Sequence, residues 1–247
     1  MDTLLILAAG VVAGAVNAIA GGGTLISFPA LLAAGLSPIT ANITSSVGLL
    51  AGYASGSMAY REELRGQQAR ARGLAVAAVL GGVAGALLLL ATPGDAFEGV
   101  VPFLVLIASV LLAIQPRMAR ALASRGQLPD HPGWQAQVAV GVASVYGSYF
   151  GAGLGVILLA VLGLLLADGM QRLNALKGVL SLVVNLAGVL VFVVAAEVDW
   201  AAAGLLAVGA VVGAYLGVRL ARRLPAQAVR AAVVVTGVGV AVVLLVR

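Results

Sequence analysis

The chain lacks cysteine altogether and has a single histidine among its 247 residues. The absence of cysteine excludes a disulfide framework and a thiolate metal site, and a single histidine excludes a histidine metal cluster. That histidine, His131, stands between Asp130 and Pro132 in a polar stretch, and no G-x-S-x-G nucleophile motif occurs. The sequence therefore predicts that the protein is not an enzyme and has no metal site and no cofactor.

Charge is also scarce. Charged residues make up 9% of the chain and apolar residues 62%, whereas ordinary soluble domains have about 25% and roughly 45 to 50%. A soluble fold of this composition would have too little polar surface to cover itself. The net charge of +5 comes from short stretches between apolar segments, which are typical of membrane loops rather than of a nucleic-acid surface. The composition predicts an all-α integral membrane protein with the lipid bilayer, and no nucleic acid, as its partner.

The apolar stretches between charges predict ten segments. Several reach the ~20 residues that a helix needs to span ~30 Å of hydrocarbon. Two short ones directly follow glycine clusters, at Gly21 to Gly23 and at Gly151 to Gly153. Short segments interrupted by glycine are typical of broken or re-entrant helices. The ten segments are 3–20, 22–35, 42–60, 73–92, 99–115, 134–150, 153–167, 173–196, 199–218 and 226–246.

Matching spacings indicate an internal repeat, in which the second half of the chain has the same pattern of segments as the first. Asn42 and Asn174 lie 132 residues apart and the glycine clusters 130 apart, and a G-x-x-x-G pair that begins at Gly81 recurs 132 residues later at Gly213. Such pairs let helices approach closely in lipid. The sequence predicts an N-terminal repeat at 1–115, a cytoplasmic linker at 116–133 and a C-terminal repeat at 134–247. Each half is expected to have one broken or re-entrant helix hairpin plus three transmembrane helices.

Charges at the segment ends predict the orientation. Basic residues gather at alternate ends, and the other ends carry only acidic ones: Asp2, Asp95, Glu98, Glu197 and Asp199. Because cytoplasmic loops collect Lys and Arg, both termini are predicted outside and the second half inverted relative to the first. No basic n-region precedes the first apolar segment, so we expect a retained N-terminus rather than a cleaved signal peptide.

Two long stretches carry a family resemblance. They are GAVNAIAGGGTLISFPALLAAGLSPITANITSSVGLLAGYASG and GSYFGAGLGVILLAVLGLLLADGMQRLNALKGVLSLVVNLAGVLVF, with Val198 to Trp200 following the second. This pattern resembles the sulfite exporter TauE/SafE family, also called the toluene sulfonate uptake permease family, across both halves. The resemblance implies a small carrier of sulfur-containing anions (sulfite, sulfonate or sulfoacetate type) in the bacterial inner membrane. The second cluster departs from the pattern, since it reads GAG rather than GGG.

Polar residues form a stripe in each half. On a helix, Asn174, Lys177, Ser181 and Asn185 fall within an arc of about 80°, and a first-half set falls within about 120°. Polar groups that face hydrocarbon are costly, so both stripes are predicted to face the interior and, under inverted symmetry, each other near the midplane. The first-half set is Asn42, Ser45, Ser46, Tyr53 and Ser57.

The glycine clusters add a second anion-binding element. Helices that restart there leave amides unpaired, and these groups favour an anion. Alternatives stay open: the glycines serve only close packing, Lys177 snorkels to the interface, and Asn17 and Tyr149 make helix–helix hydrogen bonds. The predicted substrate-binding residues are Asn17, Gly21, Gly22, Gly23, Thr24, Asn42, Ser45, Tyr149, Gly151, Gly153, Asn174, Lys177 and Ser181.

The mechanism expected is alternating access by a carrier for small anions. Moving a negative charge outward across an inside-negative membrane releases ~2.3 kcal/mol per 100 mV, which favours export. The acidic residues lie at segment ends or in loops, so no buried carboxylate offers a proton relay. The alternative is an anion or small-solute channel with paired half-helices. The sequence leaves the anion, the coupling ion and the oligomeric state open, a homo-oligomer included.

Overall fold

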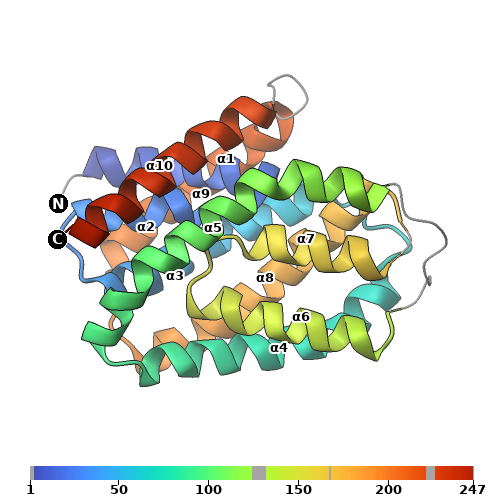
Figure 1. The fold of residues 1–247 in the computed structure, drawn as a ribbon, viewed down its shortest axis with the longest axis horizontal. Coiled ribbons are helices and arrows are strands. Elements are labelled where there is room, and N and C mark those ends of the chain that lie inside the picture. The colour runs from blue at the N-terminus through green and yellow to red at the C-terminus, as the bar shows by residue number, and fades with distance from the viewer. Residues whose placement is uncertain (1–2, 124–131, 167, 221–225, 247) are drawn as a thin grey trace.

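The computed structural model describes residues 3–123, 132–166, 168–220 and 226–246. Within these ranges the chain forms ten α-helices and no strand (Figure 1), which confirms the all-α prediction, and each predicted segment overlaps one helix. The helices are α1 (Thr3–Ala20), α2 (Thr24–Ala33), α3 (Pro38–Ala59), α4 (Gln68–Ala91), α5 (Gly94–Ala123), α6 (Trp134–Tyr149), α7 (Leu154–Leu165), α8 (Met170–Ala195), α9 (Trp200–Leu220) and α10 (Ala226–Val246).

Helix α5 is longer than the sequence pattern predicted. It continues past 115, through Pro116, to Ala123 and so occupies part of the segment expected to be a linker. The residues after Pro116 are mostly Ala, Arg, Leu and Met, the strongest helix formers, and they outweigh the breaker at the start of the run. His131 lies outside the described residues.

Helix lengths separate membrane-crossing elements from interrupted ones. Among the described residues, α4, α5, α8 and α9 contain windows long and apolar enough to cross a bilayer. Helices α2 and α7 have 10 and 12 residues, which at 1.5 Å per residue is about 15 to 18 Å and less than a ~30 Å hydrocarbon layer. The expectation of two short segments after the glycine clusters is confirmed.

Small residues bring the crossing helices into backbone contact. A Cβ at Gly217 in α9 would lie 2.7 Å from the Cα of Ala15 in α1, and Gly213 is crowded by the α1 backbone in the same way. Gly81 and Gly85 in α4 meet the α6 backbone. The two G-x-x-x-G pairs thus serve the close helix packing that their spacing predicted.

Helix contacts recur when α1–α5 are exchanged for α6–α10. Helix α1 packs on α9, as α6 packs on α4, and α3 packs on α9, as α8 packs on α4. The pairs α3 with α8 and α5 with α10 are their own counterparts. In Figure 1 the start of α1 and the end of α10 lie toward the same end of the bundle. This exchange pattern is what a two-fold relation between the halves would produce.

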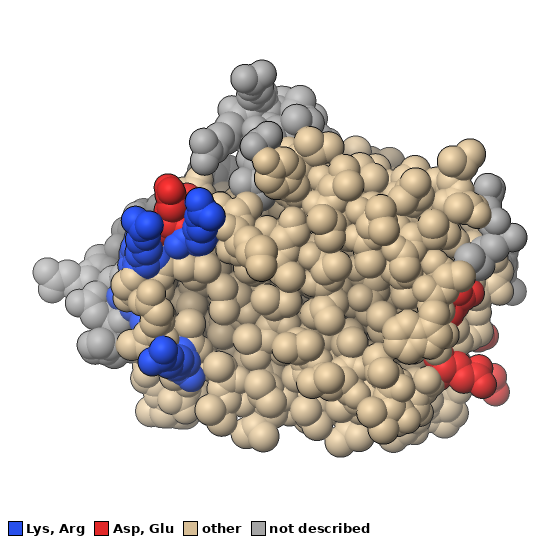
Figure 2. All heavy atoms as spheres, turned by 180° about the vertical axis from the view of Figure 1, so that it is seen from behind, with Lys and Arg blue, Asp and Glu red and all other residues tan. Residues whose placement is uncertain are grey.

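Charged residues separate to opposite ends of the bundle, with uncharged surface between them (Figure 2). The intervening surface is apolar on its outward faces: Leu80 and Val194, for example, are 66% and 87% exposed, as suits contact with lipid. The basic end comprises Arg61, Arg65, Arg70, Arg72, Arg117, Arg172 and Arg230, with Glu62, Glu63 and Asp168 among them. The acidic end comprises Asp95, Glu98, Glu197 and Asp199.

Candidate functional site

A small cavity lies inside the bundle where the end of α1 meets α3 and α8. Its volume is about 20 Å³, which is room for about one water molecule. The lining residues come from three elements: Asn17, Ala18 and Gly21 at the end of α1; Gly52, Tyr53, Gly56, Ser57 and Tyr60 of α3 and its C-cap; and Asn174, Lys177, Gly178 and Ser181 of α8. We call this the inner cavity.

The inner cavity follows from the pattern of its two long helices. Residues one turn apart share a helix face, so Lys177 and Ser181 line the cavity from α8 while Tyr53 and Ser57 line it from α3. Glycines interleave with these polar side chains on both helices and leave space between them. The polar stripe of α8 and the C-terminal part of the α3 stripe therefore do face each other across the interior.

Lys177 is the charged group of the inner cavity and the single lysine of the chain. Only 4% of the residue is exposed, so its side chain lies inside the bundle rather than extended to the interface. Among the described residues it makes no ion pair. A buried charge is costly unless it is paired and hydrogen-bonded. A negative charge in the inner cavity would therefore stabilise the ammonium group of Lys177.

Unpaired hydroxyl groups surround the lysine. The Oγ atoms of Ser57 and Ser181 are buried and have no hydrogen-bond partner within the described part of the chain. Asn17 lies within hydrogen-bonding reach of the Tyr53 hydroxyl, which ties the end of α1 to α3. Buried polar groups are nearly always satisfied in proteins, so the two serine hydroxyls are groups that a ligand or a water molecule would complete.

The two glycine clusters meet each other rather than both facing the inner cavity. A Cβ at Gly21 would lie 2.7 Å from the Cα of Gly155, and the reverse also holds. Gly21 has a φ of 80°, a conformation that favours glycine. Its N–H donates to the Asn17 carbonyl at 3.0 Å, so this amide closes α1 and is not offered to a ligand. The first cluster reaches the inner cavity only through Gly21, and Gly153 lies against Ala108 of α5 instead.

The first part of the α3 stripe is engaged in protein contacts. The Asn42 side-chain amide donates to the Tyr149 carbonyl at 2.8 Å, and the hydroxyls of Ser45 and Ser27 are 2.6 Å apart. Both Asn42 and Ser45 are fully buried. These contacts join α3 to the α6–α7 turn and to α2, away from the inner cavity.

The structure thus divides the predicted site residues. It brings together Asn17, Gly21, Asn174, Lys177 and Ser181, and it places Gly22, Gly23, Thr24, Asn42, Ser45, Tyr149, Gly151 and Gly153 outside the lining. Lining residues absent from the predicted set are Ala18, Gly52, Tyr53, Gly56, Ser57, Tyr60 and Gly178. Tyr53 and Ser57 carried a usable signal, because both belong to the α3 stripe.

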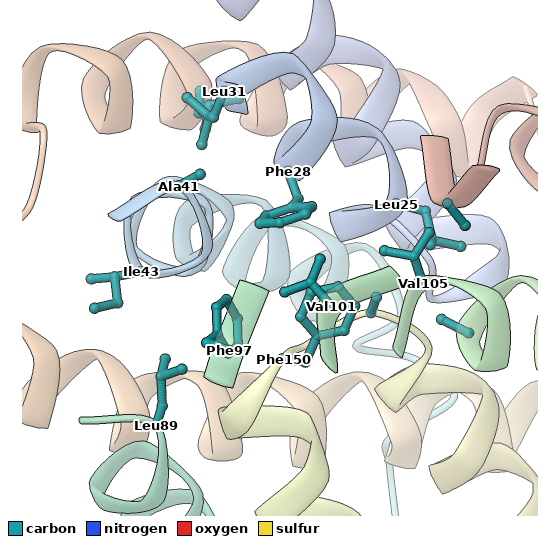
Figure 3. Packing of buried hydrophobic residues seen from close by; sticks show 14 of the residues in the cluster. Leu25, Phe28, Leu31, Ala41, Ile43, Leu89, Phe97, Val101, Val105 and Phe150 are labelled. Atoms are coloured by element: carbon teal, nitrogen blue, oxygen red, sulfur yellow. The ribbon is translucent and has the colours of Figure 1, made fainter. Parts of the chain in front are cut away.

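Aromatic rings pack together where α2, α5 and the end of α6 meet. Phe150, just before the second glycine cluster, packs edge-on against Phe28 of α2, with ring centroids 5.4 Å apart. Phe97, near the start of α5, lies 6.4 Å from Phe150. Figure 3 shows these rings among the aliphatic side chains of Leu89, Val101 and other core residues. A space of about 800 Å³ adjoins Glu98 at the acidic end, between α2, α5 and α10. Toward the basic end, a cavity of about 220 Å³ shares Tyr60 and Asn174 with the inner one.

Ion pairs join the loops at the basic end. Asp168, between α7 and α8, accepts from Arg70 of α4 at 2.6 Å and from Arg172 of α8 at 2.8 Å. Arg172 also donates to the Arg65 carbonyl at 3.1 Å. Burial alone would raise the pKa of Asp168, but hydrogen bonds from Arg172, the Gly169 N–H and Arg70 outweigh it and hold the pKa below its ordinary value. Arg172 therefore ties loops together and does not line the inner cavity.

Comparison with known proteins identifies the family of this chain. The family model for the sulfite exporter TauE/SafE matches residues 6–244. A protein of Sinorhizobium sp, "Probable membrane transporter protein ORF9", is 27% identical over 95% of this chain and 88% of its own length. "Probable membrane transporter protein YfcA" of Escherichia coli K12 is 28% identical over 84% of this chain and 76% of its own length.

A third relative, "Probable membrane transporter protein" of Haemophilus influenzae, is 28% identical over 89% of this chain and 86% of its own length. All three matches extend over both halves of a bundle whose apolar helices suit a bilayer and whose interior holds a buried cation. The chain is a membrane transporter that belongs to the sulfite exporter TauE/SafE family.

Proposed function

We propose that this protein carries small oxyanions of the sulfite or sulfonate type, with Lys177 of the inner cavity as the central binding group. One observation supports this above all others: the buried ammonium group shares its cavity with two unpaired serine hydroxyls and has no carboxylate partner among the described residues. Such an arrangement is costly when empty and favourable when an anion supplies the missing charge and acceptors.

The donors suit an anion with several oxygen atoms. An ammonium group offers three N–H donors, and the hydroxyls of Ser57, Ser181 and Tyr53 add further donors from two helices. Hydrogen bonds that involve a charged group are about twice as strong as neutral ones. No acidic residue lines the inner cavity, so nothing there repels a negative ligand.

The inner cavity must open to admit such a ligand, because about 20 Å³ holds about one water molecule. The inner cavity shares Tyr60 and Asn174 with the 220 Å³ cavity on the basic side and shares no lining residue with the space at the acidic end, which supports access from the basic end in this conformation. The exchange pattern of helix contacts supports an inverted repeat, and such repeats rock about a shared site in alternating access. The small volume of the inner cavity favours a carrier over an open channel.

The charge distribution supports export. Basic residues at one end favour that end as cytoplasmic, with both termini outside. The anion would then load from the cytoplasm, through the side on which the inner cavity adjoins a larger space, and leave down the electrical gradient, which contributes ~2.3 kcal/mol per 100 mV.

Ligand-dependent stability of the purified protein tests the proposal. Sulfite, sulfoacetate and taurine are added to the wild type, to Lys177→Met and to the matched control Arg72→Gln, whose exposed charge lies outside the inner cavity. An anion that binds the folded state raises the melting temperature. We expect the rise in the wild type and the control and its loss in Lys177→Met, a variant that removes an unpaired charge and so should fold. An equal rise in all three proteins refutes the site.

Transport by reconstituted protein tests the mechanism. Proteoliposomes preloaded with unlabelled sulfoacetate should accumulate labelled sulfoacetate by exchange, and the exchange should saturate. Flux that rises without saturation and needs no anion on the other side would identify a channel instead.

A further inference from the structure

The 220 Å³ cavity at the basic end, which we call the vestibule, contains a cation of its own. Arg230, near the start of α10, lines it opposite Met170 and Gln171 of α8. Among the described residues, no acidic one contributes to the lining. A cationic cavity of this size accommodates a small organic sulfonate, which the inner cavity in this conformation does not.

The guanidinium of Arg230 is held in place but not neutralised. Its Nε donates to the side-chain oxygen of Gln115 in α5 at 3.2 Å, and Gln115 is only 6% exposed. Among the described residues Arg230 makes no ion pair. An oriented guanidinium offers paired N–H groups that match the oxygen atoms of a sulfonate or sulfite.

The vestibule and the inner cavity meet at two shared residues. Tyr60, the C-cap of α3, and Asn174, in the first turns of α8, line both. They therefore form a partition between Arg230 on the basic side and Lys177 on the inner side. A helix movement that separates α3 from α8 at this level would join the two cavities.

We propose that the vestibule is an outer anion subsite, in which a small oxyanion binds Arg230 before Tyr60 and Asn174 part to admit it to Lys177. This inference rests on the proposed function, because it adds an initial binding step before the anion reaches the same central site. It assigns separate roles to the two cations: Arg230 attracts and holds the anion in the conformation described, and Lys177 binds it once the inner cavity has opened.

The absence of cysteine gives a direct test, since Gln171→Cys places a single thiol on an exposed residue of the vestibule. Its reaction rate is measured with sulfonatoethyl methanethiosulfonate, an anion, and with trimethylammonioethyl methanethiosulfonate, a cation. We expect Arg230→Gln in this background to lower the anion-to-cation rate ratio about tenfold, as loss of local electrostatic attraction would. Arg72→Gln, which removes an exposed charge of the same end, should change it far less. Equal changes in the two variants overturn the subsite.

Protection by a ligand separates this inference from the proposed function. Sulfoacetate should slow labelling of Gln171→Cys, and it should still do so when Lys177→Met is added, because the outer subsite does not need Lys177. Arg230→Lys, which keeps the charge but loses the fork, should keep the rate ratio and weaken protection. Absent protection in the Gln171→Cys protein overturns the vestibule proposal, whereas persistent thermal stabilisation of Lys177→Met by sulfoacetate overturns the role of Lys177 alone.

Discussion

Asn42 and Asn174 lie 132 residues apart at matching places of the two halves, and so do Ser45 and Lys177, yet their surroundings differ. Asn42 donates to the Tyr149 carbonyl and Ser45 pairs with Ser27, so both are engaged by neighbouring helices. Asn174 and Lys177 line the inner cavity, and Lys177 has no charged partner among the described residues. At these two positions the first-half residues join helices, and their second-half equivalents line a cavity.

This difference shows that residues at matching positions of the two halves need not share a role. A polar side chain buried between helices stabilises them when its hydrogen bonds are made within the protein, and it marks a binding site when they are not. In the first-half stripe, Asn42 and Ser45 make their contacts within the protein, whereas Tyr53 and Ser57 line the inner cavity. The second-half stripe faces the side where the vestibule lies. The conformation is therefore asymmetric even though helix contacts recur between the halves.

Exchange of the two equivalent residues should give the largest effects. Ser45→Lys places a charge beside Ser27 in a fully buried contact, and an uncompensated buried charge costs about 3 to 5 kcal/mol of folding free energy. Lys177→Ser should leave the fold intact and abolish stabilisation by sulfoacetate. Unfolding followed by circular dichroism, with and without the anion, measures both. A stable Ser45→Lys protein would contradict the buried contact between Ser45 and Ser27.

The asparagine pair should separate stability from binding. Asn42→Ala removes the donor to Tyr149 and should cost about 1 to 3 kcal/mol of stability without changing anion affinity. Asn174→Ala should weaken the affinity and leave the anion-free stability nearly unchanged. Isothermal titration together with melting curves tests this. The reverse pattern would move the central site to the first half.

Substitution of Ser181, whose equivalent in the first half is Leu49, should have a smaller effect on anion affinity. Ser181→Ala removes an unpaired hydroxyl, so stability should hold while anion affinity falls by the roughly 1 kcal/mol of one hydrogen bond. Leu49→Ala, at a buried apolar position, should lower the stability by about 2 to 5 kcal/mol. The anion affinity of the protein that remains folded should not change. Unchanged binding by Ser181→Ala would remove its hydroxyl from the site.

Loss of the ion pairs of Asp168 with Arg70 and Arg172 should have the smallest effect on stability, and this effect should depend on pH. The pKa of Asp168 lies below its ordinary value of 3.8 in the folded protein, so its contribution to stability is present above that value and is lost as pH falls through the folded pKa. Asp168→Asn should therefore melt below the wild type at pH 7, and the difference should shrink as the pH falls below 3.8. A constant difference in melting temperature across this range would contradict a role for the ionised carboxylate.

Much of the helix plan follows from local sequence properties. Apolar run length placed the helices, and glycine clusters located α2 and α7, because a helix in lipid must be long and apolar while an interrupted one needs residues that tolerate unusual backbone angles. The end of α5 was misjudged, since Pro116 is a local stop signal that the helix formers after it outweigh. Periodicity identified the α8 stripe, and Lys177 and Ser181 line the inner cavity.

The sequence by itself determined that this chain is a helical membrane protein with a matched pair of polar stripes, because composition and periodicity dictate which faces can meet lipid. Only the tertiary structure decided which residues of the stripes line the inner cavity and which make contacts within the protein. That choice depends on what each polar atom meets across the bundle: Tyr149 lies 107 residues from Asn42 in the chain and still accepts its hydrogen bond. The position of Gly21 against Gly155 is likewise a contact between distant segments, and spacing along one helix carries no information about it.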